Sequence, residues 1–221
     1  MSIRPADAPA SPGRGLPRRR MLALAAALAL ASGSTTLPVR AADADPASAR
    51  ITAFYAVLLD TMKVAARLPV KARYEKLEPA VRAAFDLPAM TRIAVGPPWT
   101  TLAPDVQQAL MEQFARMTIA TYASRFDGYA GEHFEVDPVA EERGANRIVH
   151  TRLVQVKGDP VVLNYLMHST PDGWKATDVY LSGTISELAT RRSEFGGILR
   201  SGGGEALVAN LRQRADKLLA G

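Results

Sequence analysis

The chain has 221 residues, with 27 basic and 22 acidic side chains and no cysteine. This length suits a single domain with a substantial core, preceded by a short leader. The absence of cysteine excludes disulfide bonds and thiol chemistry, so packing alone must stabilise the protein.

Residues 1–41 are predicted to be a signal peptide. RGLPRRR is a positively charged n-region, MLALAAALALA has the length of an h-region, and LPVRAAD offers a small-residue cleavage site. A single-pass membrane anchor is the alternative, although the apolar stretch is short for a bilayer. Cleavage after Ala41 removes six basic residues and one acidic residue, which leaves a formally neutral mature chain. We therefore expect an exported domain over residues 42–221 and no nucleic-acid partner.

The first half of the mature chain has helical periodicity. Apolar residues recur between Ile51 and Met62 at helical spacing, which predicts a helix over about 47–67. A second helical stretch covers residues 74–85, in which Pro79 is expected to open a new turn.

Two further helices are predicted before the chain becomes strand-like. Asp86 is placed to cap a short helix that begins near Pro88 and ends at Gly96. A longer helix is expected from Pro104 to about Asp127, and its wide apolar surface indicates that it is well buried.

From residue 132 the apolar period changes to two. The turn sequences KGD and TPDG separate the later strands and favour an antiparallel meander. Helical periodicity returns from Ile185 to Leu199, and the glycines at 202–204 separate that helix from a last one. The prediction is an α+β fold with N-terminal helices, a four-stranded antiparallel sheet and C-terminal helices. The four strand candidates are HFEVDPVAEE, NRIVHTRLVQV, PVVLNYLMH and WKATDVYLS.

The third strand candidate has one wholly apolar face. If a tight hairpin closes at Gly158 and Asp159, the preceding strand adds its own residues to this face, and His150 lies opposite His168 on the other. The periodicity is compatible with a filled core and with a cavity wall. The shared face comprises Val149, Thr151, Leu153, Val161, Leu163, Tyr165 and Met167.

Motifs for enzymatic or metal chemistry are absent from the sequence. There is no GxSxG, HExxH, GxxxxGK or GxGxxG motif. His150 and His168 lack a third ligand, so we expect no metal and no cofactor. The glycines at 202–204 suit a helix end better than a phosphate site. Asp178 is the one acidic candidate for an enzyme with an apolar pocket, and we expect no catalytic residue.

Two long stretches resemble MlaC-type periplasmic lipid-binding proteins, the toluene-tolerance auxiliary family. The first is FDLPAMTRIAVGPPWTTLAPDVQQALMEQFARMTIATYAS, and the second runs from GDPVVLNYLMH through GWKATDVYLSG to RRSEFGGILRSGGGEAL. The form SGTISELATRRSEF and the glycine run are most similar to the hopanoid-associated HpnM branch. The chain departs from the family pattern at Arg191, where a Tyr is usual, and at Ala103, where Ser or Thr is usual.

The resemblance implies that the sheet and the helices enclose an apolar pocket for lipid chains. Two exposed acyl chains cost about 25 kcal/mol in water, so a carrier must hide nearly all of them. The implied ligand is a hopanoid or a phospholipid, and Tyr165 and Thr151 are expected near the polar atoms at its mouth. The implied lipid-binding residues are Val149, Thr151, Leu153, Val161, Leu163, Tyr165, Met167, Phe114 and Met117.

The resemblance also implies partners. We expect a monomeric carrier that works with an inner-membrane lipid transporter, with an outer-membrane acceptor as an additional partner to consider. Two alternatives stay open: a periplasmic adaptor of a membrane complex that binds no lipid, and a small enzyme with an apolar pocket.

Overall fold

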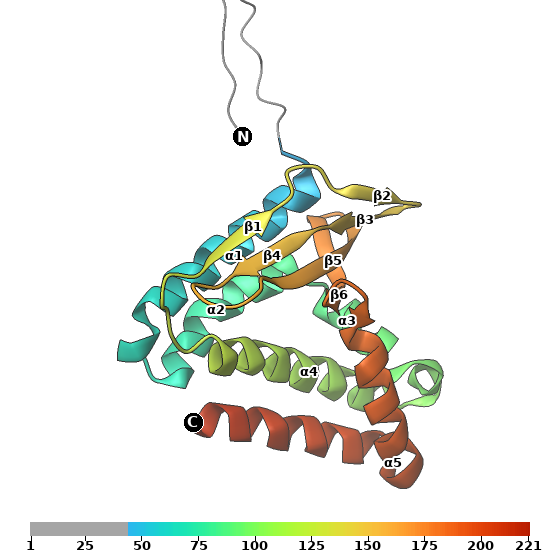
Figure 1. Ribbon diagram of the computed structural model, residues 1–221. Coiled ribbons are helices and arrows are strands. Elements are labelled where there is room, and N and C mark those ends of the chain that lie inside the picture. The colour runs from blue at the N-terminus through green and yellow to red at the C-terminus, as the bar shows by residue number, and fades with distance from the viewer. Residues whose placement is uncertain (1–43) are drawn as a thin grey trace, which may run out of the picture. The chain divides into compact units, whose positions relative to one another are not determined.

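The computed structural model describes residues 44–221 (Figure 1). The predicted signal peptide lies outside the described residues and stays a prediction. Within residues 44–221, no helix combines the length and the apolar character that a membrane span requires.

The predicted N-terminal helices are present. Asp45 and Asp86 each cap the helix that follows, and Asp86 accepts its bond from the Ala89 N–H at 2.9 Å, as predicted. Pro79 lies inside its helix and does not open a new turn. The elements are α1 (Pro46–Val64), α2 (Val70–Ala84), α3 (Leu87–Val95) and α4 (Pro104–Arg125), with short 3-10 turns at Ala65–Arg67 and Pro97–Thr101.

The α+β class is confirmed, but the sheet has seven strands and not four. The first strand candidate divides around Pro138, which cannot donate a ladder hydrogen bond, and the second divides at His150. The seventh strand, Ile185–Ser186, pairs with the end of the fourth candidate and occupies the two residues where the C-terminal helix was expected to begin. All strand pairs are antiparallel, and β5 is the central strand, paired with β3, β4 and β6. The strands are β1 (His133–Val136), β2 (Glu141–Arg143), β3 (Asn146–Val149), β4 (Thr151–Val154), β5 (Val161–Thr170), β6 (Gly173–Leu181) and β7 (Ile185–Ser186).

The register between β4 and β5 differs from the expected one. Leu153 pairs with Val161, so residues 155–160 form a loop in place of a tight hairpin. His168 pairs with Asn146, and therefore does not face His150. The shift is an even number of residues, which leaves the same side chains on the same face of the sheet.

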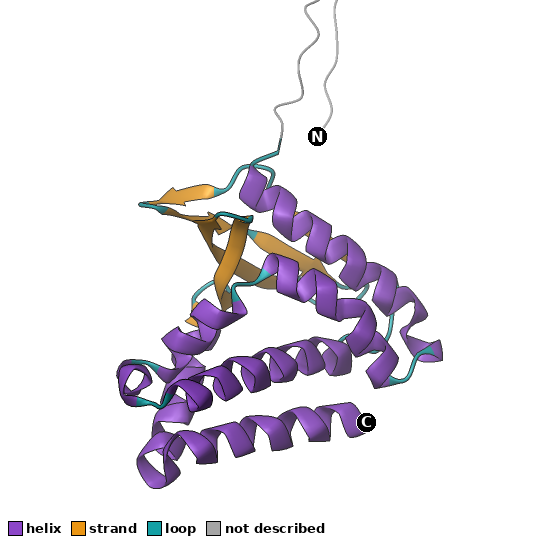
Figure 2. Ribbon diagram, turned by 180° about the vertical axis from the view of Figure 1, so that it is seen from behind, coloured by secondary structure: helices purple, strands orange, loops and turns teal. Residues whose placement is uncertain are grey.

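The C-terminal helices form a bent pair, α5 (Glu187–Ala220). Gly203 has a φ of 70°, which only glycine adopts readily, and it separates a first arm (residues 187–202) from a second arm (residues 204–220). The second arm runs alongside α4 (Figure 1), and Arg116 pairs with Asp216 at 2.7 Å. Seen from behind, the helices lie together on one side of the strands (Figure 2).

Gly204 allows a close approach of the second arm to α4. A Cβ atom at this position would lie 2.5 Å from Val106 Cγ1 and 2.9 Å from Leu102 Cδ2. We expect Gly204→Ala to lower the free energy of unfolding by about 1–3 kcal/mol, because these contacts are too short. Gly197→Ala is the matched control. Its Cβ meets nothing within 4 Å, and helix propensity should raise stability by about 0.5–1 kcal/mol. Urea unfolding of both variants tests the difference, and equal effects would contradict it.

Candidate functional site

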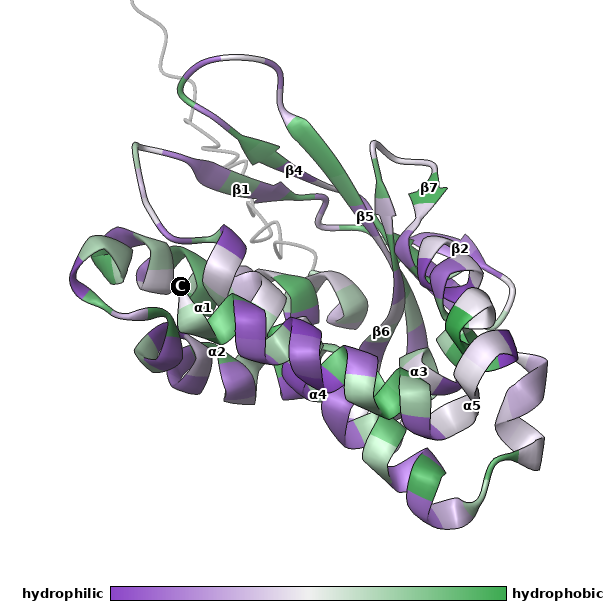
Figure 3. Ribbon diagram, turned by 90° about the horizontal axis from the view of Figure 1, so that it is seen from below, coloured by the Kyte–Doolittle hydropathy of each residue, from purple (hydrophilic) through white to green (hydrophobic). Residues whose placement is uncertain are grey.

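A cavity of about 430 Å³ lies between the sheet and the helices. Its volume is within the range of about 300–1,000 Å³ that is usual for small-molecule sites. Hydrophobic residues along β4 and the adjoining part of β5 are visible in Figure 3. The apolar lining comes from the strands through Leu153, Val161, Leu163, Val179 and Leu181, and from the helices through Leu58, Met90, Phe114, Met117 and Leu188, with Phe85 and Phe126 at the ends of α2 and α4.

Six of the nine residues expected at the site line this cavity: Leu153, Val161, Leu163, Tyr165, Phe114 and Met117. The other three, Val149, Thr151 and Met167, are buried on the same face of the sheet but are not part of the cavity wall. They lie at the end of the face that α1 covers, since α1 contacts β3 and β6. The strand period predicts which face of the sheet is buried. It does not predict where along that face helices cover the side chains and where the cavity begins.

Apart from Phe114, the aromatic residues at the cavity from the helices and their ends were not among the expected site residues. Tyr55, Phe85, Tyr122 and Phe126 all line it. Phe85 lies with its ring centroid 5.7 Å from that of Tyr122, and Tyr122 stacks on Phe126 at 5.8 Å. Apolar spacing marked these helices as buried. It contained no signal for which buried positions would face an empty space.

Three hydroxyl groups meet beside the cavity, two of them from the lining residues Tyr55 and Tyr165. The Tyr55 hydroxyl lies 2.7 Å from Thr151 Oγ1 and 2.9 Å from the Tyr165 hydroxyl, and Thr151 donates a hydrogen bond to the Leu163 carbonyl. Tyr165 and Thr151 are therefore buried in the interior and do not lie at the mouth as expected, with exposed fractions of 1% and 3%. The mutual hydrogen bonds satisfy their polar atoms.

These tyrosines are held in the neutral form. Burial raises the pKa of Tyr55 to about 12. Its hydrogen bonds to Thr151 and Tyr165 lower the pKa, but by less than burial raises it. Burial also raises the pKa of Tyr122 and of Tyr165 above the ordinary value. The inner wall of the cavity therefore carries hydroxyl groups but no charge at neutral pH.

Charged side chains lie at the helix ends that border the cavity. Arg125 ends α4, and Arg191 and Glu187 come from the first turns of α5. Arg191 lies 3.3 Å from Glu194 and 3.9 Å from Glu187. A hydrogen bond from Arg214 is the main cause that lowers the pKa of Glu194. The charge of Arg191 is thus balanced within the protein.

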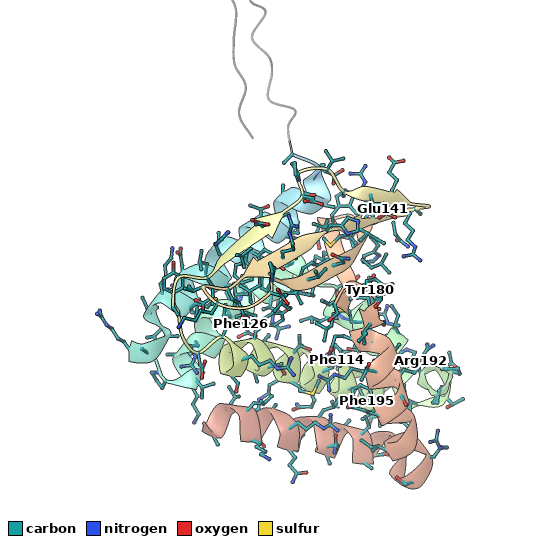
Figure 4. The ribbon with its side chains drawn as sticks, in the orientation of Figure 1. Phe114, Phe126, Glu141, Tyr180, Arg192 and Phe195 are labelled. Carbon is teal, nitrogen blue, oxygen red and sulfur yellow. The ribbon has the colours of Figure 1, made fainter. Side chains whose placement is uncertain are left out.

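Arg192, beside Arg191, faces a different part of the structure. Its Nε donates to the Ile93 carbonyl at 3.0 Å, near the C-terminus of α3 (Figure 4). This contact satisfies a carbonyl at the end of that helix and ties the first arm of α5 to it.

Asp178, the acidic candidate for an enzyme, has a structural role. It accepts hydrogen bonds from the Val179 N–H at 2.8 Å, the Ser186 hydroxyl at 2.5 Å and the Leu188 N–H at 3.1 Å. It does not line the cavity. These bonds join β6 to the start of α5, and they leave its carboxylate engaged with the protein.

The histidines are bound to single carboxylates. His150 Nε2 lies 2.8 Å from Glu141, and His168 Nε2 lies 2.9 Å from Asp86. In the part of the chain that the structure describes, no group of three or more His, Cys, Asp or Glu side chains is placed to hold a metal ion.

Comparison with known proteins identifies the family. No curated protein matches the chain. A solved structure of the phospholipid-binding protein from Ralstonia solanacearum, in complex with a phospholipid, is similar in fold, with a TM-score of 0.69 and 23% identity. The match covers 79% of this chain and 99% of that one. The family model described as MlaC protein matches residues 55–213. The chain therefore belongs to the MlaC family.

Proposed function

We propose that the protein is a periplasmic lipid carrier without enzymatic activity. The observation that carries the proposal is the cavity of about 430 Å³, whose wall is mostly apolar and whose inner hydroxyl groups are neutral. An acyl chain in water costs about 0.8 kcal/mol for each exposed CH₂ group, and such a cavity removes that cost. The engagement of Asp178 at the start of α5 supports the non-enzymatic role.

The proposed ligand is a phospholipid. The similar protein from Ralstonia solanacearum binds one. Arg125 also supports this choice, because it borders the cavity and forms no ion pair with any carboxylate among residues 44–221. A guanidinium group suits a phosphodiester. A hopanoid, the ligand that the branch resemblance implies, is the competing choice, because its rigid rings lose little freedom when bound.

The carrier would work between membranes. We propose that residues 1–41 direct export and are removed, and that the mature monomer exchanges lipid with an inner-membrane transporter. The family membership supports this setting. An outer-membrane acceptor would complete the path, and the adaptor role is the alternative that leaves the cavity without lipid.

The test begins with protein purified from the periplasmic fraction. Its N-terminal sequence should begin at or near Ala42, and organic extraction with mass spectrometry should recover phospholipid. Delipidated protein is then offered equal amounts of phosphatidylglycerol and a hopanoid in mixed vesicles. We expect phospholipid uptake, reduced about tenfold by Arg125→Gln, since a charged hydrogen bond contributes about 1.5–3 kcal/mol.

Arg191→Gln is the matched control, because the charge of Arg191 is already balanced by Glu194 and Glu187. It should leave uptake nearly unchanged. If the delipidated protein takes up the hopanoid in preference to phosphatidylglycerol, the ligand is a hopanoid and not a phospholipid. Protein that yields no lipid on extraction, and takes up neither lipid from the vesicles, would support the adaptor role.

A further inference from the structure

A second cavity of about 260 Å³ lies beside the first. Its lining is more polar and includes Arg82, Asp86 and Lys175. Among the described residues, Phe85 is the only one that lines both cavities. It therefore stands where the two spaces come closest to each other.

Two backbone hydrogen bonds, from Phe85 and from the next residue, fix the position of Phe85. Its N–H donates to the Val81 carbonyl at 2.9 Å, and the next N–H, of Asp86, donates to the Ala176 carbonyl of β6 at 2.9 Å. The ring packs edge-on against Phe54 and lies 6.0 Å from the ring of Tyr165. The backbone at Phe85 is therefore fixed, and the side chain is the part that a substitution can remove.

We propose that Phe85 is a partition that determines the longest acyl chain the protein accepts. The inference rests on the proposed function, because it concerns the same cavity. On the large-cavity side the ring is the last apolar surface that a chain end would meet. Beyond it the walls carry Arg82, Asp86 and Lys175, which a methyl group contacts poorly.

The physical consequence is a sharp dependence on chain length. A methylene group moved from a bilayer into the cavity stays in an apolar environment, so uptake from vesicles changes little while the chain fits. A methylene group that no longer fits is left against water or polar groups. It costs about 0.8 kcal/mol, which is about fourfold in uptake. Uptake should therefore be level up to a limiting length and then fall about fourfold per methylene.

The experiment offers delipidated protein to vesicles that contain a homologous series of phosphatidylglycerols, which differ only in the length of saturated acyl chains. Bound lipid is identified by mass spectrometry. Phe85→Ala empties the space that the ring fills beside the rings of Phe54 and Tyr165. The limit should move to chains at least about two methylenes longer, so that chains just beyond the original limit gain about tenfold or more. Phe85→Leu removes less of the partition and should give a smaller shift.

Phe195→Ala is the matched control. It removes the same side chain from the buried core, but Phe195 lines neither cavity, so the limit should stay where it is. An equal shift in this variant, or an unchanged limit in both Phe85 variants, overturns the partition. Circular dichroism identifies variants that do not fold. If Phe85→Ala does not fold, the chain-length limit of Phe85→Leu tests the partition. If the original protein takes up no phosphatidylglycerol of any length, it is the proposed function that fails.

Discussion

Leu163→Glu is expected to reduce lipid uptake by about a thousandfold or more while the protein stays folded. Leu163 lines the cavity and is only partly buried, so its carboxylate can be hydrated when the cavity holds no lipid. Bound lipid would displace that water and leave an unpaired charge among methylene groups. The penalty for such a charge is several kcal/mol, and about 4 kcal/mol corresponds to a factor of about a thousand in affinity.

Val149→Glu provides the informative comparison. Val149 is on the same face of the sheet, but it is fully buried and does not line the cavity. A carboxylate at this position has no access to water in the folded protein, so the substitution should prevent folding. Leu163→Met should keep both the fold and the lipid, because it conserves size and polarity. Circular dichroism and mass spectrometry of extracted lipid measure the two properties, and normal lipid content in folded Leu163→Glu would mean that the proposed cavity is not the lipid site.

The cavity-facing side of the sheet could be predicted in part because the side-chain period of a strand is two. This period places Val161 and Leu163 on one face of their strand, and the expected hairpin register adds Leu153 of the preceding strand to that face. The assignment held although the expected hairpin at Gly158 was wrong. If the register between two strands is wrong by an even number of residues, each residue is paired with a different partner. Its side chain nevertheless stays on the same face of the sheet.

The depth of the cavity could not be predicted from the sequence. Whether a buried residue contacts a neighbour or an empty space depends on the distance between elements that are far apart along the chain. Val149 and Leu163 look equivalent in the sequence, yet α1 covers one and leaves the other at the cavity wall. Likewise, Tyr55 and Thr151 are 96 residues apart, and only the packed fold shows their hydrogen bond.

Two of the three additional strands arise from local breaks in the hydrogen bonding. Period-two patterns run through Pro138 and His150 without interruption, whereas hydrogen bonding does not. Pro138 lacks a donor, and at His150 the chain passes from the part of β5 around Tyr165 to the part around Val161. Such breaks depend on which partner each residue finds, which an apolar pattern does not contain.

The buried tyrosines predict a loss of stability in alkali. Burial raises the pKa of Tyr55 to about 12 in the folded protein, whereas an unfolded tyrosine titrates near 10. Between these values the unfolded chain releases a proton that the folded protein retains, so stability falls as the pH rises. The stabilisation is complete below about pH 10. A shift of one pKa unit corresponds to about 1.4 kcal/mol, so the expected loss is about 3 kcal/mol by pH 12 from Tyr55 alone.

Tyr122 and Tyr165 should steepen this loss, because burial raises the pKa of each as well. Urea unfolding at a series of pH values from about 8 to 12 measures the slope. Tyr55→Phe should be less stable at pH 8, since it loses the hydrogen bond to Thr151, but it should lose less stability above pH 10. Tyr129→Phe is the control, because Tyr129 is 45% exposed, and it should follow the original protein. A slope in Tyr55→Phe equal to that of the original protein would show that burial does not raise the pKa of Tyr55, and the loss of stability in alkali would then have to come from other groups.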